Sequence, residues 1–477
     1  MDDSVLNLNE LTETNAIESD FSPSESPAIE SPLTEEINKI RQQFNYGPYP
    51  RVPLDDSPKD AYEMLYLHSF VTSYYLRHRR VPDTKGKVIL DAGCGSGYKA
   101  LILAEANPGA KIVGIDLSEE SVKLAEKRLA HHGFTNTEFH VLRIEELPKL
   151  GMKFDYINCD EVLYLLPNPT AGLAAMKAVL QPDGLIRTNL HSAYQRANFF
   201  RAQELFRFMG LMDSAPQELE EAAVVDTMTA LKDHVVLKAQ IWHNKGFDTL
   251  TGDALSQSLG ANMLLVGDTG YKIPDVFEML DAVDLEFVSM LNWRHWDITD
   301  LFKNTEELPD IWALGLATAS LAERLYTYEL LNPIHRLFDF WCTHPGEPGQ
   351  SVDEWDDERW KTANVHLHPQ LRRDEIREEL VNCVQSGKGF EISRYIKVPS
   401  LNPVFLEPTQ AACLLPLWEG AQSMQVLVDR YSKIRPIDPI TLAPLTETDA
   451  FEAVKDVVNR MDAFLYVLIE PGDSPGM

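Results

Sequence analysis

Two carboxylates and three closely spaced glycines form the clearest chemical pattern in the chain. Gly93, Gly95 and Gly97 follow Asp91, which ends one apolar run, and Asp116 ends the next apolar run. Glycines at such a turn let the backbone approach a bound molecule where a Cβ atom would intrude. The carboxylate of Asp116 is placed to accept hydrogen bonds from both hydroxyls of a ribose, and that of Asp91 suits a cationic group. The pattern therefore predicts a nucleoside site at the carboxyl edge of two parallel strands.

A nicotinamide dinucleotide is the competing ligand for this glycine turn. Its fingerprint is Gly-x-Gly-x-x-Gly, whereas here the third glycine comes one residue early and Tyr98 occupies its place. A dinucleotide would set its pyrophosphate over the helix N-terminus. S-adenosylmethionine would instead set its amino-acid portion and its sulfonium there, beside the Asp91 carboxylate. The spacing therefore disfavours an NAD-dependent dehydrogenase.

The elements that must position these residues alternate between strand and helix patterns. The expected strands lie near 87–91, 111–115, 138–142, 153–158 and 184–190. The expected helices lie near 98–106, 118–132 and 170–180. Alternation at this pitch predicts an α/β fold, in which a parallel sheet carries helices on both faces.

Three later segments extend the pattern, and together they resemble the class I (Rossmann-like) S-adenosylmethionine-dependent methyltransferase family, in particular bacterial members with a C-terminal extension. These segments are 139–148, 154–167 and 178–186, which resemble the family's third-strand motif, its fourth-strand motif and the turn before its fifth strand. The resemblance implies a Rossmann-like methyltransferase sheet and S-adenosyl-L-methionine as cofactor. It implies cofactor-binding roles for Asp91, Gly93, Gly95, Gly97, Asp116, Leu117, Ile144, Glu145 and Asp160.

Methyl transfer from a sulfonium asks little of protein side chains, because the methyl group is already activated. The protein mainly holds the nucleophile in line with the S–CH₃ bond. A general base is needed only when the acceptor carries a proton at neutral pH. The candidates near the site are Asp160, Glu161, Tyr164 and His191, and for His191 a structural hydrogen bond is the alternative.

The chain divides by composition into five expected segments. These are an acidic, disordered tail (1–33), an N-terminal helical lid (34–85), the methyltransferase domain (86–298, with 191–262 as a mainly helical cover), an α+β accessory region (299–407) and a small C-terminal domain that loosely resembles a winged-helix module (408–477). Tyr46 and Tyr49 resemble the family's lid over the cofactor. The alternative for them is a strap that packs on the sheet.

Charge and cysteine content narrow the partners and the compartment. The net charge of −30 repels phosphate backbones, which makes nucleic acid an unlikely partner. Five irregularly spaced cysteines predict free thiols and a cytoplasmic protein, and no spacing predicts a metal site. No apolar stretch is long enough to predict a membrane span.

We therefore expect an enzyme that methylates a small molecule or a protein, with a possible homodimer through the C-terminal region. The alternative is a regulatory or assembly protein that binds S-adenosylmethionine without catalysis.

Overall fold

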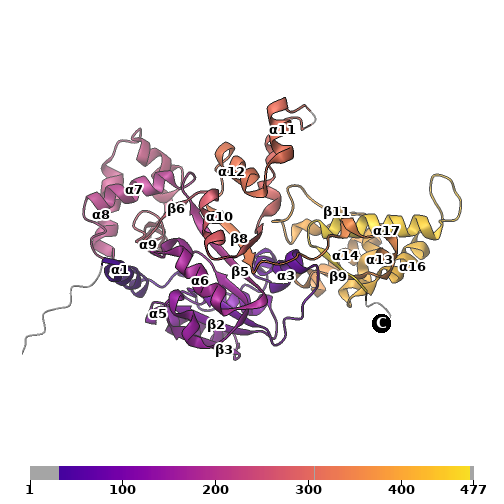
Figure 1. The fold of residues 1–477 in the computed structure, drawn as a ribbon, viewed down its shortest axis with the longest axis horizontal. Helices are drawn as coiled ribbons and strands as arrows, with labels where there is room; N and C mark the ends of the chain where they lie inside the picture. The colour runs from indigo at the N-terminus through magenta and orange to yellow at the C-terminus, as the bar shows by residue number, and fades with distance from the viewer. Residues whose placement is uncertain (1–31, 306, 473–477) are drawn as a thin grey trace, which may run out of the picture.

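The computed structural model describes residues 32–305 and 307–472, which form two units (Figure 1). An α/β unit runs from residue 32 to residue 343, and a C-terminal unit runs from residue 352 to residue 470. The predicted acidic tail lies outside the described residues except for its last two positions. Among the described helices, none is both long and apolar enough to cross a membrane.

One eight-stranded sheet forms the core of the α/β unit. Its strands are β1 (Val88–Ala92), β2 (Lys111–Asp116), β3 (Thr137–Val141), β4 (Phe154–Cys159), β5 (Leu180–Ser192), β6 (Gly270–Tyr271), β7 (Glu286–Met290) and β8 (Leu337–Thr343). They lie in the order β3-β2-β1-β4-β5-β8-β7, and the short β6 pairs with the end of β5. The pairings from β3 to β5 are parallel, so the carboxyl ends of these strands share one edge. All five predicted strands of the alternating segment are present.

Strand β8 lies between β5 and β7 and runs antiparallel to both. It comes from the segment that the sequence assigned to the accessory region, so the predicted domain end at residue 298 leaves out one strand of the sheet. In this sheet β7 pairs with β8 and not with β5. The strand that joins β7 to the rest of the sheet therefore comes from beyond residue 298. Phe338, Phe340 and Cys342 are buried on one face of β8, and Trp341 is buried on the other.

Helices cover both faces of the sheet, and their ends follow local capping signals. The helices are α4 (Tyr98–Ala106), α5 (Glu119–His131), α6 (Pro169–Val179), α10 (Ile273–Ala282) and α12 (Leu321–Leu331), whereas α11 (Asp310–Thr318) projects away from the sheet (Figure 1). The Ser118 hydroxyl caps α5 by accepting a hydrogen bond from the Ser121 N–H, and the Asn168 side chain caps α6 in the same way. Caps of this kind satisfy backbone donors that a helix leaves unpaired.

A helical cover stands over the carboxyl edge of the sheet. It consists of α7 (Ala197–Phe208), α8 (Glu218–Ala230), the short η3 (Lys238–His243) and α9 (Gly252–Gly260), and it packs against the N-terminal α1 (Pro32–Tyr46). Gln43 ties the two together, because its amide donates to the Leu264 carbonyl (2.9 Å) and accepts from the Val266 N–H (3.2 Å). Helix α1 therefore closes one side of the strand edge.

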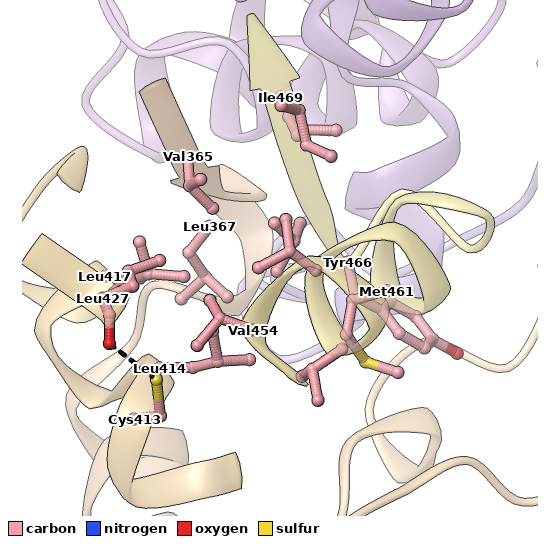
Figure 2. Packing of buried hydrophobic residues seen from close by; sticks show 14 of the residues in the cluster. Val365, Leu367, Cys413, Leu414, Leu417, Leu427, Val454, Met461, Tyr466 and Ile469 are labelled. Carbon is pink, nitrogen blue, oxygen red and sulfur yellow. Dashed lines mark hydrogen bonds between the residues drawn. The ribbon is translucent and has the colours of Figure 1, made fainter. Parts of the chain in front are cut away.

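The C-terminal unit has a three-stranded antiparallel sheet of its own. Strand β9 (Asn364–Leu367) is central, with β12 (Gln422–Ser423) on one side and β13 (Val467–Glu470) on the other. Its helices are α13 (Asp357–Thr362), α14 (Asp374–Ser386), α15 (Pro408–Leu414), α16 (Met424–Ile434) and α17 (Glu447–Asp462), and a short β10–β11 pair (Phe390–Glu391, Phe405–Leu406) lies beside them. Figure 2 shows the apolar cluster that joins these elements.

The predicted boundary at 407/408 runs through this sheet, because β9 precedes it and β12 and β13 follow it. The two flanking strands pair with β9 and not with each other, and α16 and α17 separate them along the chain. Within 408–472 they therefore form no hairpin like the wing of a winged-helix module.

Two short helices of the lid connect the units. They are α2 (Tyr62–Leu67) and α3 (Phe70–His78), which lie between the sheet and the C-terminal unit (Figure 1). The Tyr75 hydroxyl donates to Asp462 (2.5 Å), and the Thr72 hydroxyl contacts His368 (3.0 Å). Tyr66 and Tyr75 are fully buried in the apolar cluster of the C-terminal unit.

Candidate active site

A cavity of about 330 Å³ lies at the carboxyl edge of the sheet, between the glycine turn and the lid. Ile40 and Phe44 of α1 and Tyr49 of the segment after it form the lid side. The turn after β1, the end of β2 and the segments after β3 and β4 form the opposite side. We call this the first cavity.

Asp116 stands at the tip of β2 with its carboxylate held by backbone N–H groups. Gly95 donates to Oδ2 (2.9 Å) and Ser118 donates to Oδ1 (2.8 Å). Burial raises the pKa of Asp116, and the N–H donors of Ser118, Gly95 and Leu117 oppose that rise. Each oxygen keeps a further lone pair, so the carboxylate fits the pair of ribose hydroxyls that the sequence predicts for it.

The glycines of the turn are required by contacts within the protein itself. All three have positive φ angles. A Cβ on Gly95 would overlap the carbonyl oxygen of Tyr49, and a Cβ on Gly97 would overlap Ala125 of α5. Gly93 and Gly95 also line the first cavity, whereas Gly97 does not. Packing within the protein thus accounts for these glycines, and their role in making room for a ligand stays a prediction.

Asp91 is buried at 1% exposure and keeps one carboxylate oxygen without a hydrogen-bond partner among the described residues. Its other oxygen accepts from the Asn158 amide (2.9 Å). Burial raises the pKa of Asp91 to about 7, and the Asn158 hydrogen bond opposes this. An ammonium group would provide the missing partner, so the residue fits the amino-acid end of S-adenosylmethionine. Asp91 itself does not line the cavity.

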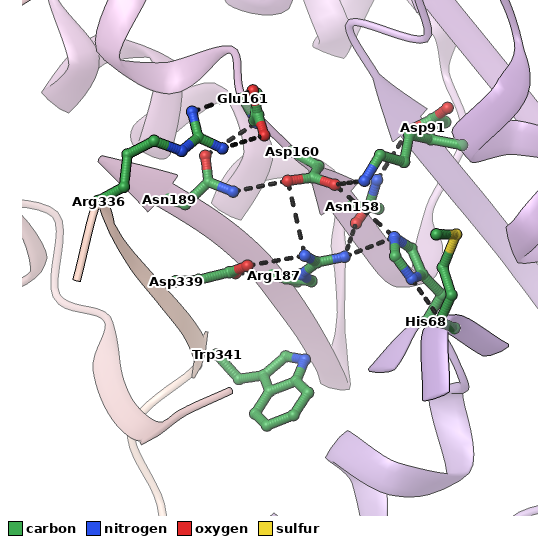
Figure 3. Close-up of polar contacts among 12 residues, drawn as sticks. His68, Asp91, Asn158, Asp160, Glu161, Arg187, Asn189, Arg336, Asp339 and Trp341 are labelled. Carbon is green, nitrogen blue, oxygen red and sulfur yellow. Dashed lines mark hydrogen bonds and ion pairs between the residues drawn. The ribbon is translucent and has the colours of Figure 1, made fainter. Parts of the chain in front are cut away.

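Asp160, which lines the first cavity, is the centre of a cluster of charged side chains (Figure 3). Asp160 pairs with Lys99 (2.5 Å) and Arg187 (3.5 Å), and it accepts from the Asn189 amide (2.6 Å). Arg187 also pairs with Asp339 of β8 (2.7 Å). Burial alone would raise the pKa of Asp160, but Arg187 and Lys99 outweigh it and hold the pKa well below its usual range. Asp160 is therefore an anion at neutral pH, as a partner for a cationic ligand must be.

His68, between α2 and α3, completes this cluster. Its Nε2 atom accepts from Arg187 (2.6 Å), and its Nδ1 atom lies 2.8 Å from the Met64 carbonyl. An arginine can only donate, so the proton of the neutral ring is on Nδ1. Burial lowers the pKa of His68 to about 4, which keeps the ring neutral at neutral pH.

Glu161 follows Asp160 in a backbone conformation that side chains other than glycine rarely adopt, with φ at 62°. Its N–H donates to the Asn189 side chain (2.8 Å), and Arg336 donates to its carboxylate (2.6 Å). Glu161 lines the first cavity and also a second cavity of about 80 Å³, which lies between α1, α9 and the segment after β4. The hydrogen bonds to Asn189 and Arg336 therefore stabilise the strained backbone of Glu161, which lies where the two cavities meet.

His191, a predicted catalytic residue, is fully buried and lines neither cavity. Its Nδ1 atom lies 2.6 Å from Asp268, and its Nε2 atom accepts from Arg336 (3.1 Å). Burial lowers its pKa to about 4. Tyr164 stacks on the ring at 3.7 Å between centroids and lines the second cavity. His191 thus supports the wall of the second cavity, and its role as a base stays a prediction.

The structure brings most of the predicted cofactor residues to the first cavity. Those that line it are Gly93, Gly95, Asp116, Leu117, Ile144, Glu145 and Asp160. Sequence reasoning missed Lys99 and Arg336. Lys99 could have been found, because it falls in the first turn after the glycines. Arg336 gave no signal, since it precedes a strand that was not predicted.

Comparisons with known proteins agree with this geometry. Residues 83–253 match a family model described as "Methyltransferase domain". Over 105 residues the chain is 34% identical to the ubiquinone biosynthesis O-methyltransferase of Haemophilus ducreyi, covering 21% of this chain and 44% of that protein. An uncharacterized protein of Synechococcus sp. is 30% identical over 178 residues, covering 37% of this chain and 42% of that protein. Residues 83–253 are therefore similar in sequence to methyltransferase domains.

The wider fold has a solved counterpart. PKMT2 from Rickettsia typhi, also solved in complex with AdoHcy, has a TM-score of 0.54 to this chain at 16% identity. The match without the ligand covers 89% of this chain and 78% of that one. The chain spans less than half the length of the curated relatives named above. At 16% identity, the match to PKMT2 shows the fold alone.

Proposed function

We propose that the protein is an enzyme that transfers a methyl group from S-adenosylmethionine to a small molecule or a protein side chain by in-line displacement. The observation that carries the proposal is the first cavity together with two carboxylates, Asp116 in its lining and Asp91 in β1, just before the glycine turn. Asp116 is available to the ribose, and Asp91 has a buried oxygen without a partner.

The other end of the first cavity suits the adenine ring. Ile144 supplies an apolar wall and Glu145 an acceptor for an amino group, and both begin the short helix η1 (Ile144–Leu150) after β3. Bound S-adenosylmethionine would supply an electrophilic methyl group. The chain's own contribution is to hold the sulfonium end near Asp160, to exclude water beneath the lid and to position the nucleophile.

The proposal is tested first by calorimetry with S-adenosylhomocysteine. Replacing Asp116 with Ala removes charge-assisted hydrogen bonds to the ribose, and the loss of even one, worth about 1.5–3 kcal/mol, should lower the affinity by roughly 10- to 150-fold. Asp456→Ala, at an exposed position on α17, is the matched control and should bind like the native protein. Equal affinity in the Asp116 variant and the native protein would contradict the proposed cofactor site.

Catalysis itself is tested with S-adenosylmethionine that carries a labelled methyl group. Purified protein is incubated with this donor and cell extract, and label in the products is measured. An enzyme transfers label, whereas a protein that only binds the cofactor for regulation or assembly transfers none. A homodimer through the C-terminal unit remains a prediction, and sedimentation of the same material tests it.

A further inference from the structure

We propose that the second cavity receives the methyl acceptor, and that Glu161 binds the acceptor at an N–H or O–H group, which becomes methylated. This inference rests on the proposed function and specifies the chemical class of its substrate. An acceptor that reacts through a carboxylate is excluded by it.

The two cavities adjoin each other. Phe44, Tyr49, Glu161 and Leu165 line both of them, so these side chains lie where the cofactor site and the second cavity meet. Of the four, Glu161 is the only one with a charge. It also follows directly on Asp160, the centre of the charged cluster, which lines the cofactor site. An acceptor in the second cavity therefore reaches the cofactor at Glu161.

The second cavity leads outward from these shared residues to a polar mouth. Ser256 stands at the mouth, where it accepts from Arg51 (3.2 Å) and donates to Glu221 (2.9 Å). Between the mouth and Glu161, the walls are aromatic and aliphatic side chains, including Tyr164 and Leu264. A volume of about 80 Å³ suits a slender group rather than a broad one.

Glu161 is fixed in position but keeps the capacity to accept a hydrogen bond. The Arg336 guanidinium approaches Oε1 at 2.6 Å and Oε2 at 3.5 Å. A carboxylate offers about four lone-pair sites, so others stay available on a side chain that is 24% exposed. Because its backbone and its side chain are both held, Glu161 is preorganised to bind the acceptor in one position.

The charges favour a nucleophile that can donate a hydrogen bond. The charged residues that line the second cavity are Glu161, Glu221 and Arg51, and Arg51 is at the mouth. Arg336 pairs with Glu161 but does not line the second cavity, so a carboxylate acceptor would meet the Glu161 carboxylate and not the guanidinium, which is unfavourable. An O–H or N–H group can instead donate to Glu161. Its lone pair then forms the bond to the methyl carbon, the electrons of the C–S bond stay on sulfur, and the proton passes to the Glu161 carboxylate.

Binding of small probes tests the cavity without knowledge of the natural acceptor. The native protein, saturated with S-adenosylhomocysteine, is titrated with 1-pentylamine, 1-pentanol and pentanoate, and the dissociation constants are measured by NMR. We expect the amine or the alcohol to bind at least about tenfold more tightly than pentanoate, a difference of about 1.4 kcal/mol. Equal binding of pentanoate, or binding of none of the probes, overturns the proposal.

Ala261→Phe places a ring in the second cavity, which Ala261 lines. The variant should bind the tightest-binding probe at least about tenfold more weakly than the native protein does. Its affinity for S-adenosylhomocysteine should stay within about twofold of the native value. Ala230→Phe, at the exposed end of α8, is the matched control. Glu161→Gln keeps the size of the side chain and should abolish the discrimination against pentanoate. Unchanged probe binding in Ala261→Phe overturns the assignment of the cavity.

The labelled product of the extract assay gives an independent readout. Mild base releases volatile methanol from methyl esters, but not from methylated amines or ethers, so we expect the label to be stable. Cation exchange of the stable product then separates amine from hydroxyl acceptors. If the native protein transfers no label, the proposed function fails. If it transfers label as a methyl ester, or if Ala261→Phe transfers label as fast as the native protein, only the present inference fails.

Discussion

The first cavity and the second cavity differ in how far apart in the sequence their lining residues lie. Apart from the lid, the first cavity takes its lining from residues 93–167, a segment that holds the motifs resembling those of the family. The second cavity takes its lining from four separate stretches, near residues 43–51, 161–165, 216–221 and 256–265. The charged cluster centred on Asp160 adds Asp339, and Arg336 holds Glu161. The proposed cofactor site thus depends on local motifs, whereas the proposed acceptor site depends on the assembly of distant segments.

The largest effect on stability is expected from a substitution of Asp160, which joins the local β4 segment to the distant β8 segment through Arg187. Asp160→Ala leaves the buried Arg187 with Asp339 alone as its carboxylate partner in the cluster, and it removes the partner of Lys99, so the cluster gains one net positive charge. Removing one partner of a buried ion pair typically costs about 3–5 kcal/mol. Urea unfolding should show this loss, and Asp456→Ala should change stability by less than about 0.5 kcal/mol. Equal stability in the two variants would mean that the cluster does not hold the β4 and β8 segments together.

A smaller effect separates the roles of two glycines with nearly the same backbone conformation. Gly97 and Gly86 have φ angles of 79° and 78°, but only Gly97 has a neighbour that a Cβ would overlap. Alanine at either position should cost about 1–2 kcal/mol for the left-handed conformation. Gly97→Ala should lose about 1–3 kcal/mol more through overpacking against Ala125. Thermal unfolding measures the difference, and equal losses would show that packing does not set the glycine spacing.

The smallest effect is a pH dependence of cofactor-site binding. The pKa of Asp91 is raised to about 7, so this carboxyl is mainly protonated at pH 6 and mainly ionised at pH 8. Only the ionised form attracts an ammonium, so affinity for S-adenosylhomocysteine should rise with pH by up to about tenfold per unit below 7, with release of a proton. Calorimetry in buffers of different ionisation enthalpy measures that proton. Asp91→Asn should bind without this pH dependence.

The same group gives a stability change of opposite sign. Because the pKa of Asp91 is higher in the folded chain than in the unfolded chain, its contribution to stability is complete below pH 4 and is lost as pH rises toward 7 and above. Ligand-free protein should therefore lose stability over the range in which it gains affinity. A free energy of unfolding that follows the same pH curve in Asp91→Asn and in the native protein would contradict this assignment.

Much of the α/β unit could be predicted because its signals are local. The strands from β1 to β5 and the helices between them follow from short-range patterns, and the glycine turn lies within one β-α-β segment. Strand β8 could not be predicted as part of this sheet, because a chain segment of more than 40 residues separates it from β7. The boundary at 407/408 failed for the same reason, since β9 meets its partners only after the chain has folded.

By itself, the sequence determined the cofactor chemistry of this protein. Asp91, the glycine turn and Asp116 lie at adjoining strand ends in any parallel sheet built from this segment, because the spacing along the chain places them there. Only the tertiary structure decided what surrounds Glu161, placed His191 in the interior and joined the lid helices to the C-terminal unit. Those contacts depend on long-range packing and charge pairing, which no local spacing encodes.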